Sequence, residues 1–142
     1  MPRGLITAGL VVAMLARSAD AGFVLVTRVD TKVAKLSKDA IKAVFSNRTK
    51  TWSNGDTVVL VVGSEDSPAM QWLAPTFFNV STKTYLTKVK QDVFKGDMRH
   101  PLFADDDATT LKRIESTAGV VGWVTEAGAK KLPRDLAVVP SD

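Results

Sequence analysis

A short segment between an apolar run and a helix start carries the residue types best suited to bind an anion. Gly63-Ser64-Glu65-Asp66-Ser67-Pro68 follows the apolar run Thr57 to Val62. Serine followed by proline at the first helical position is a strong helix start. Free backbone N–H groups at such a start, aided by hydroxyls, form an anion site beyond the carboxyl end of a strand. We therefore expect Ser64 and Ser67 to be the ligating hydroxyls for a small oxyanion.

Two features of the same segment argue against a ligand there. Glu65 and Asp66 place negative charge where an anion would have to sit, and they repel it unless they point away. Ser67 also suits plain helix capping, which is the common use of serine at this position. The sequence leaves open whether the two acids face the expected site.

Other residue types give no support to metal binding or catalysis. His100 is the only histidine and the chain has no cysteine, which excludes thiolate nucleophiles and cysteine-bearing zinc sites. Asp105-Asp106-Asp107 lacks the alternating ligands, the central glycine and the closing glutamate of a calcium loop, and helix capping explains it more simply. The sequence contains no G-x-S-x-G nucleophile elbow. We predict a protein that is not an enzyme and needs no cofactor or metal.

Strand patterns and helix patterns alternate along the chain. The apolar, β-branched runs that predict strands are 23–27, 57–62, 119–124 and 136–139. The segments that predict helices are 37–47, a helix starting at Ser67 with Pro75 near its end or at a kink, 81 or 82 to 93, a helix capped by one of Asp105, Asp106 and Asp107, and 125–131. Residues 94–103 are expected to form a loop. This alternation predicts an α/β fold, one three-layer-like domain with a mixed, mostly parallel sheet flanked by helices.

The N-terminal segment has the parts of a signal peptide. Arg3 precedes an apolar run from Leu5 to Ala16, and the small-residue pattern Ala19-Asp20-Ala21 follows. The run has twelve residues, whereas a stable membrane anchor takes about 20. We expect residues 1–21 to be a signal peptide cleaved after Ala21 and residues 22–142 to form one exported domain, periplasmic or secreted, without a later membrane span. A short membrane anchor and a buried first helix are the alternatives.

Charge gives a mild bias only. The formal net charge of the chain is +4 at pH 7. Lysines are scattered among acids, as in Lys35, Lys38, Asp39 and Lys42, with no basic run and no ladder of interleaved aromatic residues. Nucleic acid is therefore not an expected partner. A weak preference for anionic ligands is compatible with this composition, and so is an ordinary solvated surface.

Four stretches, taken in order, resemble the phosphate-type periplasmic solute-binding proteins of ABC importers. These are Leu36 to Asn47, Trp52-Ser53-Asn54-Gly55, Val93-Phe94-Lys95-Gly96 with Pro101, and Ala118 to Val124. The resemblance extends over nearly all of residues 22–142. Full binding proteins have two lobes that close over the ligand, whereas this chain is long enough for only one. The resemblance therefore implies the fold of one lobe of a type II periplasmic binding protein.

The chain departs from this family at the residues that bind phosphate. Many family members carry an arginine followed by Ser-Gly-Thr at the helix start, where this chain has Gly63 and Ser67-Pro68-Ala69. Only Ser67 carries over, and loss of the arginine removes a bidentate, charge-assisted contact to phosphate. Two hypotheses follow. The chain is an exported solute-binding-like protein with weak binding of phosphate or another small oxyanion, or it is a non-enzymatic periplasmic interaction or sensory module whose partner is a membrane transporter or sensor.

Overall fold

The computed structural model describes residues 22–141. The predicted signal peptide, its cleavage after Ala21 and the terminal residue 142 lie outside the described residues. The strands are β1 (Phe23–Arg28), β2 (Val59–Val62), β3 (Leu102–Phe103), β4 (Val120–Thr125) and β5 (Leu136–Val139). The α-helices are α2 (Lys38–Phe45), α3 (Pro68–Phe78), α4 (Thr82–Phe94) and α5 (Asp107–Ser116), and the two 3₁₀ helices are η1 (Val29–Thr31) and η2 (Gly128–Lys131).

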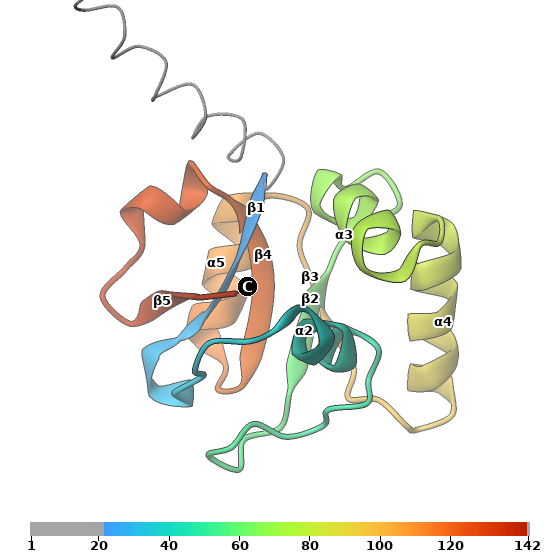
Figure 1. Ribbon diagram of the computed structural model, residues 1–142, viewed down its shortest axis with the longest axis horizontal. Coiled ribbons are helices and arrows are strands. Elements are labelled where there is room, and N and C mark those ends of the chain that lie inside the picture. Colours follow the sequence, from blue (N-terminus) through green and yellow to red (C-terminus); the bar gives the residue numbers. More distant parts are fainter. Residues whose placement is uncertain (1–21, 142) are drawn as a thin grey trace, which may run out of the picture.

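The strands form one mixed sheet (Figure 1). Its order is β3-β2-β4-β1-β5. Strand β2 pairs in parallel with both β3 and β4, while β1 pairs antiparallel with β4 and β5. Strands β2, β3, β4 and β5 therefore run in one direction and β1 runs in the other. The predicted α/β class with a mixed, mostly parallel sheet is confirmed.

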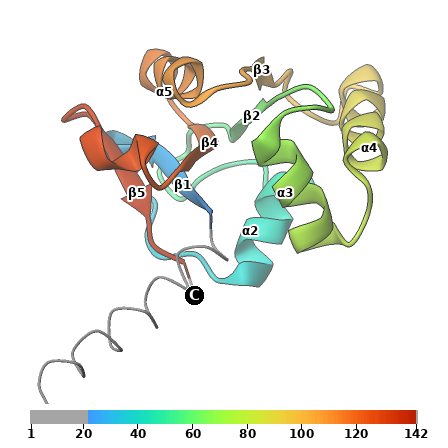
Figure 2. The same cartoon turned by 90° about the horizontal axis from the view of Figure 1, so that it is seen from above.

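Helices cover both faces of this sheet, with α5 on one face and α2 and α3 on the other (Figure 2). Successive side chains of a strand point to opposite faces, so a strand that is covered on both faces contributes to two apolar cores. In β4, Val121 and Trp123 belong to the core under α2 and α3, whereas Val120 and Val124 belong to the core that contains Ile114 of α5. The domain thus has the three layers expected from the sequence.

Helix starts are set by local capping. Ser37, Ser67, Ser81 and Asp106 are the N-cap residues of α2, α3, α4 and α5, and each accepts a hydrogen bond from the backbone N–H three residues later. This bond satisfies one of the free N–H groups at a helix start. Helix α3 continues past Pro75 to Phe78 and ends where Asn79 has a left-handed φ of 53°. The proline lies near the end of the helix, as predicted.

Two segments differ in detail from the expected pattern. The segment 94–103, expected to be a loop, ends in the two-residue strand β3, which pairs with the end of β2. The segment 125–131, expected to be a short helix, contains the 3₁₀ helix η2. Within residues 22–141, none of the helices is both long and apolar enough to cross a membrane.

Candidate ligand site beyond the carboxyl end of β2

The segment expected to bind an anion lies where two helices begin. The turn from Gly63 to Ser67 leads from β2 into α3, and the Ser67 N–H donates to the Ser64 carbonyl over 3.0 Å. The chain entering α5 runs alongside, because the Ala104 N–H donates to the Val62 carbonyl over 2.9 Å. Residues at the starts of both α3 and α5 line one cavity of about 260 Å³. The positive ends of two helix dipoles therefore lie beside this cavity.

The structure places the two predicted hydroxyls in different cavities. Ser67 is buried and lines the 260 Å³ cavity, where its Oγ accepts from the Met70 N–H over 3.5 Å. Ser64 instead lines a second cavity of about 650 Å³ between the turn and α4. A small ligand in either cavity would therefore contact only one of the two serine side chains.

An intramolecular carboxylate accepts hydrogen bonds from both donor groups of Ser64. Asp105 Oδ1 accepts from the Ser64 backbone N–H over 2.8 Å and from the Ser64 hydroxyl over 3.2 Å. An external oxyanion at Ser64 would need these same two donors. Asp105 is thus the residue that most directly determines what Ser64 can bind. Sequence reasoning considered it only as part of a calcium loop and as a helix cap.

The next two aspartates also satisfy donors around the smaller cavity. Asp106 accepts from the Thr109 backbone N–H over 2.7 Å, and this hydrogen bond holds the pKa of Asp106 below its ordinary value. Asp107 accepts from the Thr125 backbone N–H over 3.1 Å and also from the Thr125 hydroxyl. All three aspartates line the 260 Å³ cavity, which therefore offers an anion carboxylate oxygens as well as helix N-termini.

Gly63 has no space for a side chain. A Cβ added there would lie 2.7 Å from Asp105 Oδ1, 2.8 Å from the Ala104 carbonyl oxygen and 2.8 Å from Ser67 Cβ. Real Cβ atoms almost never approach other atoms so closely. An arginine at this position, such as the resembled family carries, could be accommodated only by moving Asp105 and its neighbours.

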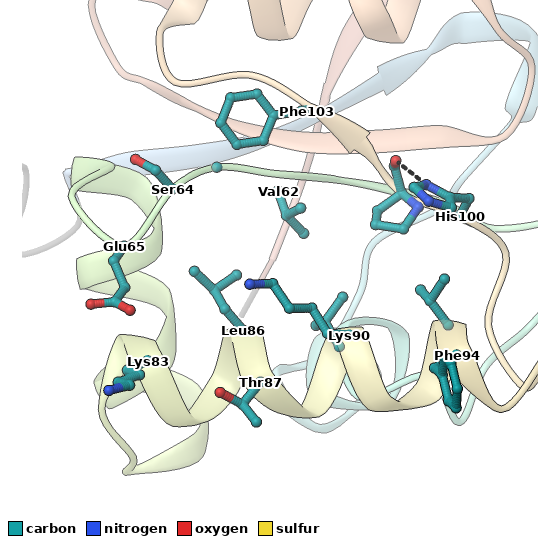
Figure 3. A pocket seen from close by; sticks show the side chains of 14 residues that line it. Val62, Ser64, Glu65, Lys83, Leu86, Thr87, Lys90, Phe94, His100 and Phe103 are labelled. Carbon is teal, nitrogen blue, oxygen red and sulfur yellow. Dashed lines mark hydrogen bonds between the residues drawn. The ribbon is translucent and has the colours of Figure 1, made fainter.

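The acids that follow Ser64 differ in their surroundings. Glu65 and Asp66 are both exposed. Glu65 lines the 650 Å³ cavity, whereas Asp66 lines neither of these two cavities. Figure 3 shows Glu65 at the end of the larger cavity that adjoins the turn and Lys83. The sequence left open whether these acids face the expected site. Glu65 lines the cavity that Ser64 also lines, whereas Asp66 does not.

The remaining candidate residues do not form a metal site within residues 22–141. No group of three or more histidine, aspartate or glutamate side chains within residues 22–141 is placed to hold a metal ion. His100 is exposed on the loop before β3 and its Nδ1 lies 3.3 Å from the Pro101 carbonyl oxygen (Figure 3). It lines the larger cavity, on the side opposite to α4.

The fold of this chain is similar to that of solved phosphate-transport receptors. An ABC-type phosphate transport receptor from Vibrio cholerae matches with a TM-score of 0.54 at 10% identity, over 84% of this chain and 46% of the receptor. PstS from Borrelia burgdorferi matches with a TM-score of 0.63 at 8% identity, over 85% and 47%. A phosphate ABC transporter substrate-binding protein with bound phosphate from Clostridium perfringens matches with a TM-score of 0.54 at 14% identity, over 85% and 45%.

These matches confirm the predicted resemblance at the level of the fold. The chain spans less than half of the length of these solved proteins, which agrees with the expected single lobe. No protein-family model matches the chain, and no curated protein matches it.

Proposed function

We propose that this chain is an exported, non-enzymatic module with a solute-binding-like fold, whose role is to contact a membrane transporter or sensor protein rather than to capture phosphate. In this proposal residues 1–21 direct export and residues 22–142 form the working domain. The observation that supports it most strongly is the Asp105 carboxylate on both donors of Ser64. The fold likeness to receptors of transport systems agrees with a partner of that class.

The local charges argue against tight oxyanion binding. A phosphate at Ser64 would have to displace Asp105, and a phosphate beside Ser67 would share its cavity with three aspartates. Like charges at such short range disfavour binding in the smaller cavity, which no lysine or arginine lines to compensate for them. A phosphate that displaces an internal carboxylate of the same charge sign gains little net binding free energy.

Weak oxyanion binding near Ser64 and Ser67 is the second candidate function, and one observation favours it. In the described structure the Ser67 Oγ only accepts a hydrogen bond, so its proton is available to a ligand in the 260 Å³ cavity. The N-terminal ends of α3 and α5 at the same cavity add favourable partial charges. One of the similar solved proteins has bound phosphate.

Thermal unfolding with and without about 10 mM phosphate distinguishes the two candidates, because a ligand at about 100 times its Kd adds roughly 2.7 kcal/mol of stability. Chloride at matched ionic strength controls for general salt effects. We expect phosphate and chloride to give the same midpoint. A phosphate-specific rise that disappears in Ser67→Ala would overturn the interaction-module proposal in favour of an oxyanion receptor.

A gain-of-binding variant tests the role of the internal carboxylate. Asp105→Ala frees both donors of Ser64, whereas Asp66→Ala removes the same charge from an exposed acid that lines neither cavity. We expect phosphate to stabilise Asp105→Ala and to leave Asp66→Ala unaffected. Equal responses of the two variants would show that net charge, and not occupancy of Ser64 by Asp105, controls anion binding.

A further inference from the structure

The larger cavity is an apolar groove between α4 and the edge of the sheet (Figure 3). Its volume is about 650 Å³, which lies within the range of roughly 300–1,000 Å³ typical of small-molecule sites. Leu86, Val89 and Val93 line it from α4, and Val62 and Phe103 line it from the sheet edge. We refer to this cavity as the α4 groove.

Aromatic side chains at the α4 groove are left open to solvent. Phe94, at the end of α4, is 93% exposed, and Phe103 of β3 is 53% exposed. Both line the groove. An uncovered aromatic ring beside an apolar hollow, such as Phe103, is typical of a surface that binds a ligand.

A lysine without a partner gives the α4 groove its charge. In Figure 3 the Lys90 ammonium extends into the groove between Leu86 and Val62. Among residues 22–141 it has no hydrogen bond or ion pair, whereas Lys88 on the same helix pairs with Asp92 over 2.6 Å. The lysine stem adds apolar surface to the wall and leaves the charged end free for an anion.

The other ionisable groups leave the lining with excess positive charge. Lys83 and Lys90 line the α4 groove together with a single carboxylate, Glu65. Glu65 lies toward the turn after β2 and His100 lies toward the opposite end of the groove (Figure 3). A ligand that places an anionic group at Lys90 and an apolar body along α4 matches both the shape and the charge.

We propose that the α4 groove binds an amphipathic carboxylate, an aliphatic or aryl-aliphatic acid whose carboxylate contacts the Lys90 ammonium. Its apolar chain lies against Leu86, Val89 and Val93 and reaches Phe103 at the rim. A charge-assisted hydrogen bond in an apolar surrounding orients the acid, and burial of its apolar chain supplies most of the affinity. This inference goes beyond the proposed contact with a transporter or sensor and does not depend on it.

An added peptide strand fits the same region less well. The edge strand β3 has only two residues, and its Phe103 carbonyl already accepts from Arg113 Nε over 3.1 Å. Strand addition relies on a row of free backbone groups along an edge, and this edge is short and partly satisfied. A bare oxyanion would leave the apolar wall uncovered, so the chain of the acid is part of the proposal.

Titration of the purified protein with decanoate below its micellar concentration tests the proposal by backbone amide NMR and by calorimetry. We expect saturable binding, with shift changes concentrated at 83–94 and 101–103. Decanol keeps the chain without the charge and acetate keeps the charge without the chain, and we expect each to bind at least about tenfold more weakly, since tenfold corresponds to only about 1.4 kcal/mol.

Matched lysine variants identify the charged contact. Lys90→Met keeps an apolar side chain of similar length on an exposed helical position, and we expect it to weaken decanoate binding about tenfold while decanol binding is unchanged. Lys112→Met on α5 removes the same charge outside the groove and should bind as the parent does. Circular dichroism verifies that both variants are folded, and Phe103→Ser provides a second groove variant with the same expected loss.

Three results would overturn the proposal. Decanoate that does not saturate shows that the groove has no such ligand class, and equal weakening by Lys90→Met and Lys112→Met shows that only net charge matters. Shift changes centred on Ser67 and Asp107 place the acid in the smaller cavity instead. Failure here leaves the phosphate experiment on Ser67 unaffected, because Ser67 lines the other cavity.

Discussion

Gly63 lies between the Asp105 carboxylate, the Ala104 carbonyl and Ser67, at distances that exclude a Cβ. Asp105 in turn holds both donors of Ser64. Gly63 and Asp105, which lie 42 residues apart in the sequence, therefore form one packed arrangement. In this arrangement the Asp105 carboxylate occupies the donors of Ser64, and the turn after β2 is tightly packed.

Gly63→Ala tests how tightly this arrangement is packed. We expect the free energy of unfolding to fall by about 1–3 kcal/mol, as for other insertions of a methyl group into a filled space. Urea unfolding measures it. In an Asp105→Ala background the same substitution should cost less, because the closest of the three contacts has been removed. Strict additivity of the two substitutions would contradict the proposed coupling between Gly63 and Asp105.

At the scale of elements, Tyr85 joins α4 to the end of α2. Its hydroxyl donates to the Phe45 carbonyl over 2.8 Å in a buried position, and its ring stacks on Phe78 with centroids 5.3 Å apart. Burial raises the pKa of the Tyr85 phenol, since the charged form would lose its hydration. This contact fixes the helix that forms one wall of the α4 groove.

Tyr85 is the only tyrosine of the chain, so phenolate absorbance reports on it alone. Its pKa is raised in the folded state, and the unfolded state therefore loses the proton first, which lowers stability as pH rises above about 10. We expect no phenolate signal until the protein unfolds. Tyr85→Phe should cost about 1–2 kcal/mol at neutral pH through the lost hydrogen bond and should abolish this alkaline contribution. Ionisation near pH 10 with native circular dichroism would contradict the buried contact.

Elements set by local residues were predictable from the sequence. A serine or aspartate cap acts on an N–H group three residues away, so Ser37 and Ser67 predict the starts of α2 and α3, and Ser81 is one of the two starts predicted for α4. Strand β3 was not predictable in this way. Its two residues become a strand only because Leu102 and Phe103 pair with Val61 and Val62 of β2, and such a pairing leaves no local pattern.

The candidate site was predictable only in part, for the same physical reason. The turn after β2 and the cap at Ser67 are local features, and both are present. The contact of Asp105 with Ser64 spans 41 positions, and the contact of the Trp52 indole N–H with the Gly119 carbonyl spans 67. Trp52 is buried in the core under α2 and α3, although its neighbours in the sequence are polar. Contacts between distant residues decide which cavity each serine lines.

The whole molecule is held together by a sheet that is shared between two cores. Leu60 of β2 belongs to the core under α2 and α3, and its neighbour Val61 belongs to the core that contains Ile114. Trp52, Trp72 and Trp123 all belong to or pack against the first core. Because the same strands build both cores, loss of either core removes the apolar packing on one face of the sheet, and we expect residues 22–141 to unfold as one cooperative unit.

Ile114→Ala tests whether residues 22–141 unfold cooperatively, because Ile114 lies on the face of the sheet opposite to the tryptophans. Ile114 is fully buried, and truncation of such a side chain costs about 2–5 kcal/mol. In one cooperative unit, tryptophan fluorescence and far-ultraviolet circular dichroism should show the same lowered urea midpoint with an unchanged slope. Leu73→Ala, equally buried in the other core, is the matched control and should behave alike. If Ile114→Ala moved the dichroism transition and left the fluorescence transition in place, the two faces would be separate folding units, and the α4 groove would then depend on only one of them.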